Sequence, residues 1–315
     1  MKLFTNYNFV CPSCKNRFIT KDKLFFCNNK KCKQFGEVDY LKNGKPILMN
    51  FENSVFCKSN LLSSDGISIL NRNVFKNYFT NFLKKLLNGS NKTTKHNLEN
   101  IVNKLTNIPD PKILIVGGGS IGVGVEILYE NFNDNIMSFD VYDSKYTHFI
   151  GDCTSIPFAD NNFDFILIQA VLEHVIDPNI AVNEIHRTLK LDGLVYAETP
   201  FLQHVHEGAY DFTRYTVLGH RILFKNFEKI SMGYIGGVGQ SMIWSIEYFS
   251  RSLFRSKIIG KIFKLLFFWL RIIESIIPDS YNEDGACGAF FYGTKKSFEE
   301  KHINEYITDY QGHQK

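Results

Sequence analysis

The segment KILIVGGGSIG, residues 112–122, decides the fold of this 315-residue chain. Its apolar start, Lys112 to Val116, predicts a short buried strand, and three consecutive glycines follow. The next residues, Val123 to Asn131, predict a helix. A glycine-rich turn between a parallel strand and a helix lets the backbone approach a ligand closely, because no Cβ atom intervenes. The segment therefore predicts an α/β domain that binds a nucleotide-like ligand at the end of its first strand.

Two carboxylates follow at the ends of the next two predicted strands. The strand over residues 135–139 leads into Asp140, at a distance from Gly117 where an acid can accept both hydroxyls of a ribose. The strand over residues 149–151 leads into Asp152. The glycine turn alone also fits a dinucleotide-binding protein, because the spacing G-x-G-x-x-G is shared by both classes. The segments that follow separate these two interpretations.

Further strands and a helix continue the alternation. We predict a fourth strand over residues 162–168, a helix over 180–189 and a fifth strand over 194–198. The order GGGSIG, Asp140, GDC, FDFILI, LEHV and LKLDGLVYAETP resembles that of class I S-adenosylmethionine-dependent methyltransferases, with six motifs in register over residues 112–200. The resemblance implies an α/β fold with a Rossmann-like, seven-stranded methyltransferase sheet.

The resemblance also implies a site for S-adenosylmethionine. In chain order its residues are Gly117, Gly119 and Ser120 on the methionine and ribose side, Asp140 on the ribose, Asp152 and the Cys153 amide on adenine, Gln169 and Ala170 beside the sulfonium, and His174 at the closing side of the pocket. One position departs from the family, because Ile115 stands where the first strand usually carries an acid. A protein that binds cofactor or a partner without catalysis is therefore retained as an alternative.

A polar segment, residues 199–216 with the sequence TPFLQHVHEGAYDFTRYT, follows the fifth strand. It resembles a segment of bacterial methyltransferases linked to cell-surface glycan synthesis, with Ala209 in place of the usual proline. Histidine is the natural base near neutral pH for a hydroxyl acceptor. We predict these roles: His206, or as second choice His204, as the base, Asp211 to orient it, Arg214 on an anionic part of the acceptor, and Tyr215 beside it. The alternative is that the histidines close a loop and the Asp–Arg pair is structural.

Four cysteines near the start of the chain predict a metal site. Cys11 and Cys14 form one close pair, Cys27 and Cys32 a second, and two such pairs on facing turns suit tetrahedral zinc. The pattern contains no histidine or carboxylate that would mark an open catalytic zinc. Residues 36–50 resemble the zinc-ribbon family related to the small activator subunit of tRNA and protein methyltransferases. This resemblance covers residues 1–50 and implies a structural Zn²⁺.

Two further regions are predicted to be helical. A connector over residues 51–110 contains helices at 73–88 and 95–105, and the methyltransferase domain over 111–315 contains a helical insertion at 238–280. The helix at 257–277 carries a broad apolar face with a basic stripe, which suits a membrane interface, a lid or a dimer contact. Its charges argue against a membrane span.

Charge is divided unevenly along the chain. Residues 1–110 hold 18 Lys and Arg against 7 Asp and Glu, whereas residues 111–315 hold 18 against 25. The basic part suits RNA, a phosphorylated substrate or an anionic membrane, or is simply solvated. Clustered cysteines and the lack of an apolar leader predict a cytoplasmic protein, with peripheral contact at the inner face of the membrane left open. The predicted reaction is methylation of a hydroxyl on a sugar or lipid-linked glycan precursor, and the alternative is an RNA methyltransferase that uses the basic ribbon.

Overall fold

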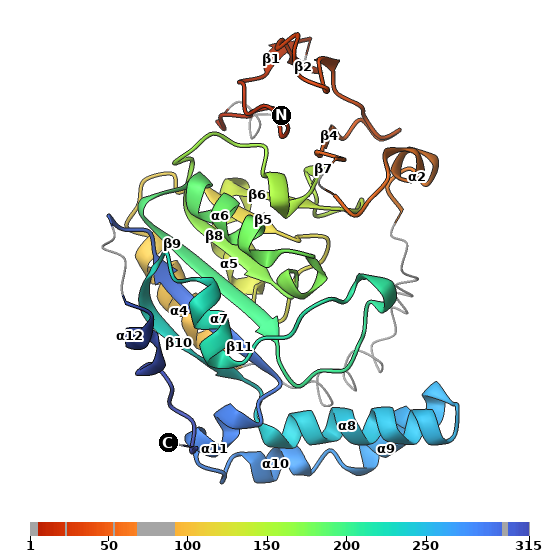
Figure 1. Cartoon of the computed structure of the whole chain (residues 1–315), viewed down its shortest axis with the longest axis vertical. Helices are drawn as coiled ribbons and strands as arrows, with labels where there is room; N and C mark the ends of the chain where they lie inside the picture. Colours follow the sequence, from red (N-terminus) through yellow and green to blue (C-terminus); the bar gives the residue numbers. More distant parts are fainter. Residues whose placement is uncertain (1–5, 23, 53, 68–91, 298–301, 315) are drawn as a thin grey trace.

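The computed structural model describes residues 6–22, 24–52, 54–67, 92–297 and 302–314 (Figure 1). A large sheet forms the centre of the molecule, a small three-stranded sheet lies beyond one of its ends, and a helical arm lies beyond the other (Figure 1). The small sheet contains β1 (Ile19–Lys21), β2 (Leu24–Cys27) and β3 (Gly36–Glu37).

The large sheet follows the strand order β10-β11-β9-β8-β5-β6-β7-β4. All neighbours from β9 to β4 are parallel, and β11 runs antiparallel to both β9 and β10. The bounds are β4 (Ile47–Leu48), β5 (Ile113–Val116), β6 (Ile136–Asp140), β7 (Phe149–Gly151), β8 (Phe163–Gln169), β9 (Leu189–Pro200), β10 (Glu228–Ile235) and β11 (Gly288–Thr294). The mixed, mainly parallel α/β sheet predicted from the sequence is confirmed.

Helices cover both faces of the sheet because its strands are apolar on both sides. In β5, Ile113 and Ile115 pack against α4 (Lys92–Leu105) and α5 (Glu126–Phe132). The alternate residues Leu114 and Val116 belong to the core on the opposite face, with α6 (Pro178–Thr188) and the end of α7 (Val217–Leu223). The glycine turn that follows β5 is therefore fixed between two packed layers.

The sheet has eight strands where the sequence predicted seven. The additional strand is β4, which pairs in parallel with β7 through Ile47 opposite Ile150 and Leu48 opposite Gly151. This strand belongs to the segment predicted as part of a separate ribbon. The ribbon also packs on the domain through Phe9, whose ring lies 4.5 Å from that of Phe158. The N-terminal module is thus an integral part of the edge of the sheet.

The remaining helices lie at the borders of the domain. The described part of the predicted connector contains α2 (Lys58–Ser63) and α4, whereas the helix predicted over 73–88 lies outside the described residues. The predicted insertion forms α8 (Val238–Leu253), α9 (Lys257–Leu266), α10 (Leu270–Glu274) and α11 (Asp279–Asp284), so the helix predicted over 257–277 is interrupted. A last helix, α12 (Ile303–Ile307), follows β11. Among the described residues, no helix combines the length and the apolar character needed to cross a membrane.

Candidate functional site

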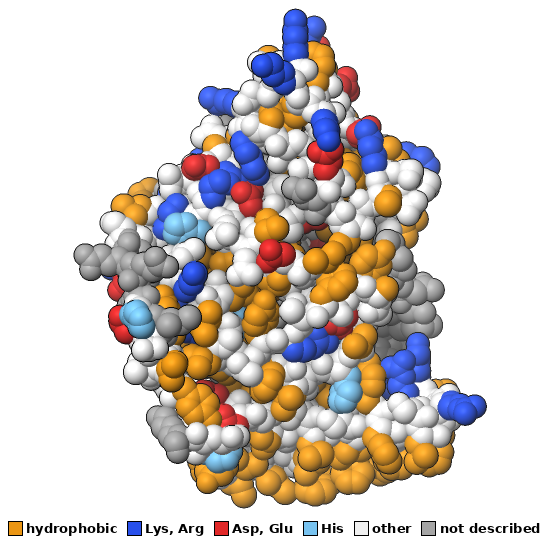
Figure 2. Space-filling view, in the orientation of Figure 1, with side chains coloured by type: hydrophobic (Ala, Val, Ile, Leu, Met, Phe, Trp, Pro, Cys, Tyr) orange, Lys and Arg blue, Asp and Glu red, His pale blue; other side chains and the backbone are white. Residues whose placement is uncertain are grey.

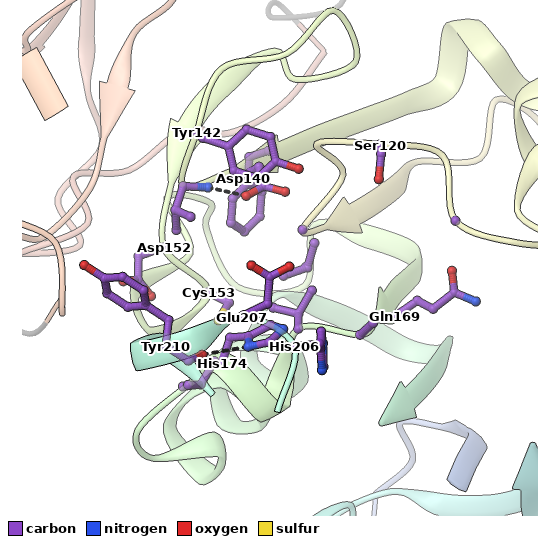
Figure 3. Close-up of a pocket in the computed structure, with 18 of the residues that line it drawn as sticks. Ser120, Asp140, Tyr142, Asp152, Cys153, Gln169, His174, His206, Glu207 and Tyr210 are labelled. Carbon is purple, nitrogen blue, oxygen red and sulfur yellow. Dashed lines mark hydrogen bonds between the residues drawn. The ribbon is translucent and has the colours of Figure 1, made fainter. Parts of the chain in front are cut away.

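A cavity of about 1280 Å³ lies at the carboxyl ends of the parallel strands (Figure 3). This edge is where open α/β sheets bind their ligands. Most of the residues that the sequence singled out for a cofactor or an acceptor line it: Gly117, Ser120, Asp140, Asp152, Cys153, Gln169, Ala170, His174, His204 and His206. Gly119, Asp211, Arg214 and Tyr215 are not among its lining residues.

The glycine turn and the acid at the end of β6 form one unit. Gly117 has a φ of +73°, and a Cβ atom there would lie 2.1 Å from Val171 Cγ2. The Gly119 amide donates to Asp140 Oδ2 at 2.8 Å, and the Val141 amide donates to Oδ1 at 2.7 Å. A Cβ atom on Gly119 would lie 2.6 Å from Asp140 Oδ2. The turn thus needs glycine at these positions, and it holds the carboxylate at the cavity wall.

Asp152, the second acid, is held by hydrogen bonds from Thr154 and from Ser54. Asp152 Oδ1 accepts from the Thr154 amide at 2.9 Å and from its hydroxyl at 2.8 Å. Asp152 Oδ2 accepts from the Ser54 hydroxyl at 2.6 Å. Two residues later, the Phe56 ring stacks on that of Tyr210, with centroids 5.4 Å apart and an angle of 8° between the planes. The segment between the ribbon and α2 therefore supplies one wall of the cavity.

A third acid, Glu198, lines the cavity from β9. It accepts hydrogen bonds from the Tyr196 hydroxyl at 2.6 Å, from Gln169 Nε2 at 2.7 Å and from the Thr94 hydroxyl. Burial raises the pKa of this carboxyl group, although the three hydrogen bonds oppose the rise. Ile115 lines the same cavity from β5. Strand β5 thus has Ile115 where an acid was expected, and an acid lines the same cavity from β9, two strands away in the sheet.

Glu173, His174 and His206 lie close together beside the cavity, which the two histidines line, and we call these three residues the Glu173 cluster. His174 Nε2 lies 3.7 Å and His206 Nε2 3.8 Å from Glu173 Oε1. The Glu173 side chain is completely buried, and neither of its carboxylate oxygens has a hydrogen-bond partner among the described residues. Burial raises the pKa of Glu173 to about 8. A buried polar group without partners is costly, so this arrangement calls for an explanation.

The two imidazoles of the cluster are oriented by acceptors behind them. His174 Nδ1 lies 2.7 Å from the Tyr210 carbonyl oxygen (Figure 3), and His206 Nδ1 lies 3.2 Å from Asp211 Oδ2. A carbonyl or carboxylate oxygen can only accept, so each Nδ1 carries the hydrogen in the neutral ring. The lone pair of each ring is therefore on Nε2, the atom that faces Glu173.

The loop that carries His206 is fixed by Arg214. Its guanidinium donates to both carboxylate oxygens of Asp211 and to the carbonyl oxygens of Gln203, His204 and Thr213. These five hydrogen bonds use all five N–H groups of the side chain. Burial alone would raise the pKa of Asp211, but the bonds from Arg214 and from the His206 amide hold it well below its usual range. In this arrangement Arg214 has no donor left for an acceptor, and it acts as a clamp on the loop.

His204 and Tyr215 lie on either side of this loop. The His204 ring stacks on that of Tyr248 from α8, with centroids 4.3 Å apart, and both line the cavity. Burial lowers the pKa of His204. Tyr215 instead donates its amide to the Pro200 carbonyl at 3.2 Å, and its half-buried ring packs against the core. Tyr215, which the sequence predicted to lie beside the acceptor, therefore does not line the cavity.

Comparison with known proteins finds a family match in the central part of the chain. Residues 123–197 match the family described as a methyltransferase domain. This stretch is therefore similar to methyltransferase domains. It includes β6, β7, β8 and α6, together with Asp140 at the end of β6, Asp152 directly after β7, and Glu173 and His174 between β8 and α6. The match agrees with the methyltransferase domain predicted from the order of the sequence motifs, over this part of the chain.

Relatives of known activity are similar over a short stretch only. The demethylmenaquinone methyltransferases of Staphylococcus haemolyticus (strain JCSC1435) and Staphylococcus saprophyticus subsp. saprophyticus are each 30% identical over 80 residues, which is 24% of this chain and 34% of theirs. The chain thus spans about a third of the length of these relatives.

Among solved structures, phosphoethanolamine N-methyltransferase 2 of Haemonchus contortus is 15% identical with a TM-score of 0.44, covering 69% of this chain and 56% of that one. A chain of a complex containing the Haloferax volcanii Trm112 methyltransferase activator is 14% identical with a TM-score of 0.43, covering 70% and 97%.

The four cysteines predicted to bind metal converge beside the methyltransferase domain. The sulfur atoms of Cys11 and Cys32 lie 3.7 Å apart, as do those of Cys14 and Cys27, and all four lie within 4.8 Å of one another. Four sulfurs placed tetrahedrally at about 2.3 Å from zinc lie about 3.8 Å apart. The donor set and its spacing therefore fit a zinc ion.

Sequence reasoning missed several residues of the cavity. Ser54 and Phe56 lay outside every motif, and Tyr210 stood in the quoted segment 199–216 without a role, because these residues come together only in the folded chain. Glu198 lay inside the predicted fifth strand but received no role. Glu173 stood in the quoted motif LEHV between Leu172 and His174, and an acid directly before a histidine was the available signal.

Proposed function

We propose that this chain is an S-adenosylmethionine-dependent methyltransferase that methylates a hydroxyl group. The observation that carries the proposal is the convergence of the glycine turn, Asp140 and Asp152 on one cavity at the carboxyl ends of β5, β6 and β7. Two acids at neighbouring strand ends suit the ribose hydroxyls and the adenine amino group of one adenosyl ligand.

The cavity has the donors and the space that this cofactor requires. Asp140 would hold the ribose, Asp152 with the Cys153 amide the adenine, and the turn at Gly117 the methionine part. Gln169 and Glu198 lie at the far side, where they would face the charged amino acid end. The cofactor supplies a methyl group on a positively charged sulfur. The protein must place the acceptor oxygen in line with that group and remove its proton.

The acceptor end of the cavity is the end that holds the histidines. We assign activation of the hydroxyl to His206, which lines the cavity and whose Nδ1 is oriented by Asp211. Stacked rings border this end, His204 on Tyr248 from one side and Tyr210 on Phe56 from the other. A sugar hydroxyl suits such a site, because aromatic rings pack against the apolar faces of sugar rings while polar groups bind their hydroxyls. This combination supports methyl transfer to a glycan precursor.

The helical arm supports an acceptor attached to a lipid. Figure 2 shows hydrophobic side chains gathered along the edge formed by α8, α9 and α10. The exposed apolar residues of this edge include Phe249, Leu253, Ile258, Leu266, Ile272 and Ile276, and exposed Arg255, Lys257 and Lys261 lie among them. The opposite side of the same arm lines the cavity through Trp244, Tyr248 and Lys264. An apolar face with basic neighbours suits the surface of an anionic membrane, next to the acceptor end of the cavity.

Calorimetry with S-adenosylmethionine tests the cofactor, and methyl transfer tests the acceptor. We expect one cofactor bound per chain and no comparable binding of NAD. With cofactor labelled in its methyl group, label should enter a glycolipid extract as a base-stable methyl ether. Absence of cofactor binding contradicts the proposal, and label that enters RNA instead redirects it to the RNA alternative.

Sedimentation with vesicles tests the membrane surface. We expect wild-type protein to co-sediment with vesicles that contain phosphatidylglycerol, and Ile258→Glu to remain in solution. Leu191→Glu is the matched control, because Leu191 is also exposed but lies on β9 away from the arm. Wild-type protein that stays in solution at low salt contradicts a membrane contact.

A further inference from the structure

The Glu173 cluster contains an unexplained buried carboxylate. Glu173 is completely buried, yet both of its carboxylate oxygens lack a hydrogen-bond partner among the described residues. Two imidazole nitrogens that carry lone pairs, Nε2 of His174 and Nε2 of His206, lie 3.7 and 3.8 Å from Oε1. When Glu173 is ionised, three electron-pair donors therefore face one another, and the contact is unfavourable without a cation among them.

We propose that Glu173, His174 and His206 bind a divalent metal ion that receives the acceptor hydroxyl. One ligand atom from each residue lies within 4.8 Å of the other two. Ligand atoms placed tetrahedrally at about 2.1 Å from a metal are about 3.4 Å apart, so the two distances from Glu173 Oε1 to the histidine nitrogens need to shorten by only about 0.3–0.4 Å. Two histidines and one carboxylate are an established ligand set for divalent first-row transition metals, and they leave further positions open.

The atoms behind the cluster are those that a metal site requires. Metal-bound histidines usually donate their second ring N–H to a carbonyl or carboxylate oxygen, which fixes the ring. Tyr210 supplies that oxygen to His174, and Asp211 supplies it to His206. The backbone carbonyl of Glu173 in turn accepts from the Phe212 amide at 2.8 Å. The loop that carries His206 is thus attached to the segment that carries the other two ligands.

The open side of the cluster faces the place where the acceptor must lie. His174 and His206 both line the cavity, on the same side as Tyr210 (Figure 3). Asp140 and Asp152, which we assign to the adenosyl group, line the cavity from β6 and from the end of β7. A hydroxyl group that binds the free positions of the ion would therefore lie between the metal and the cofactor.

This inference rests on the proposed function and specifies how the hydroxyl is activated. A divalent ion lowers the pKa of a bound hydroxyl, so that its proton passes to water in the open cavity. The oxygen lone pair then forms the new bond to the methyl carbon, while the carbon–sulfur bond breaks and its electrons remain on sulfur. In this arrangement His206 acts as a metal ligand, and Asp211 positions it.

Titration with Mn²⁺ of protein that retains zinc at its cysteines tests the site. Mn²⁺ prefers oxygen and nitrogen ligands to thiolates, so it reports on the Glu173 cluster. We expect one Mn²⁺ per chain, observed by calorimetry and by the loss of its free paramagnetic resonance signal. Glu173→Gln should weaken this binding at least about 100-fold, because it removes a charged ligand, while the zinc content stays unchanged.

A second carboxylate variant and the cofactor supply the controls. Glu247→Gln changes an acid that lines the cavity from α8 and pairs with Lys264, outside the Glu173 cluster, and this variant should bind Mn²⁺ as the wild type does. Equal Mn²⁺ affinity in wild type and Glu173→Gln, or no Mn²⁺ bound by the wild type, overturns the metal site. If such protein still binds S-adenosylmethionine, only the metal site has failed. Loss of cofactor binding in the wild type would instead overturn the proposed function.

Discussion

The four cysteines and the Glu173 cluster are both groups of metal-binding side chains, but they differ in how completely they surround an ion. The cysteines supply four equivalent donors from residues 11–32, and three of them are buried. The Glu173 cluster supplies three donors from two separate segments, and it opens on the cavity. A closed set of four thiolates leaves no position for a substrate and contributes to folding, whereas an open set can take part in chemistry. The difference predicts that the first group supports the fold and the second supports the reaction.

Replacing one ligand in each group gives the largest contrast. Zinc contributes about 10–16 kcal/mol to the folding of small zinc-binding peptides, so Cys27→Ser should unfold the ribbon. Loss of the ribbon should also destabilise the large sheet, because the ribbon segment contributes β4 to this sheet and Phe9 to its core. Glu173→Gln keeps the shape of its side chain and should change the free energy of unfolding by about 1 kcal/mol or less. Urea denaturation with zinc analysis checks both, and equal stability of the two variants would remove the contrast.

The role that we propose for the cavity depends on cofactor binding, and replacement of Asp140 tests that binding. Asp140→Asn removes the charge that we assign to the ribose hydroxyls, and a hydrogen bond to a charged group is worth about 1.5–3 kcal/mol. We expect S-adenosylmethionine to bind about 10- to 150-fold more weakly in calorimetry. Asp143→Asn is the control, because Asp143 pairs with Lys45 and does not line the cavity. Equal losses in both variants would place the ribose elsewhere.

The fold could be predicted from the sequence where local patterns decide it. Strand β5, the glycine turn and Asp140 follow from apolar runs and glycine spacing within a few dozen residues, and the structure has them at the predicted positions. Strand β4 could not be predicted as part of the large sheet. It has two residues, and its partner in β7 lies about a hundred residues away. Pairing of that kind depends on the packing of Phe9 on Phe158, which no local pattern reports.

Some residues of the candidate site could likewise be predicted from the sequence, and others could not. Its cofactor residues stand at strand ends, where the order of the chain fixes their position, and the sequence could place them. The role of Arg214 depended on which groups its guanidinium reaches, and the structure shows it bound to Asp211 and three carbonyl groups. Glu173 received no role because its importance comes from burial without a partner. Burial of that kind is a property of the packed structure.

A third buried imidazole tests whether burial alone makes a functional cluster. His220 is completely buried, its Nε2 lies 2.9 Å from the Thr199 hydroxyl, and burial lowers its pKa from 6.5 to about 3. Between these values the unfolded chain binds a proton that the folded chain does not, so stability falls as the pH falls below 6.5. From pH 7 to pH 5 the loss is about 2 kcal/mol for this group.

Urea denaturation at these two pH values isolates the effect of His220. His220→Gln does not titrate, so its free energy of unfolding should fall by about 2 kcal/mol less than that of the wild type. Acid effects on the cysteines are common to both proteins and cancel in the difference. Mn²⁺ binding should be unchanged, because this imidazole has no carboxylate facing it. Identical pH dependence in the two proteins would show that folding does not shift the pKa of His220.

The smallest expected effect concerns the connection between the two regions. Ser54 follows the ribbon and donates to Asp152, the acid that we assign to adenine. Ser54→Ala removes one hydrogen bond worth about 1 kcal/mol, so S-adenosylmethionine should bind about five-fold more weakly. Ser63→Ala on α2 removes a hydroxyl that donates only to the Asn60 carbonyl, and it should bind the cofactor as the wild type does. Because Ser54 touches neither metal cluster, a cofactor effect confined to its variant would show that the ribbon segment helps to build the cavity through the position of Asp152. An unchanged affinity in Ser54→Ala would instead mean that the closed cluster supports the fold without shaping the site.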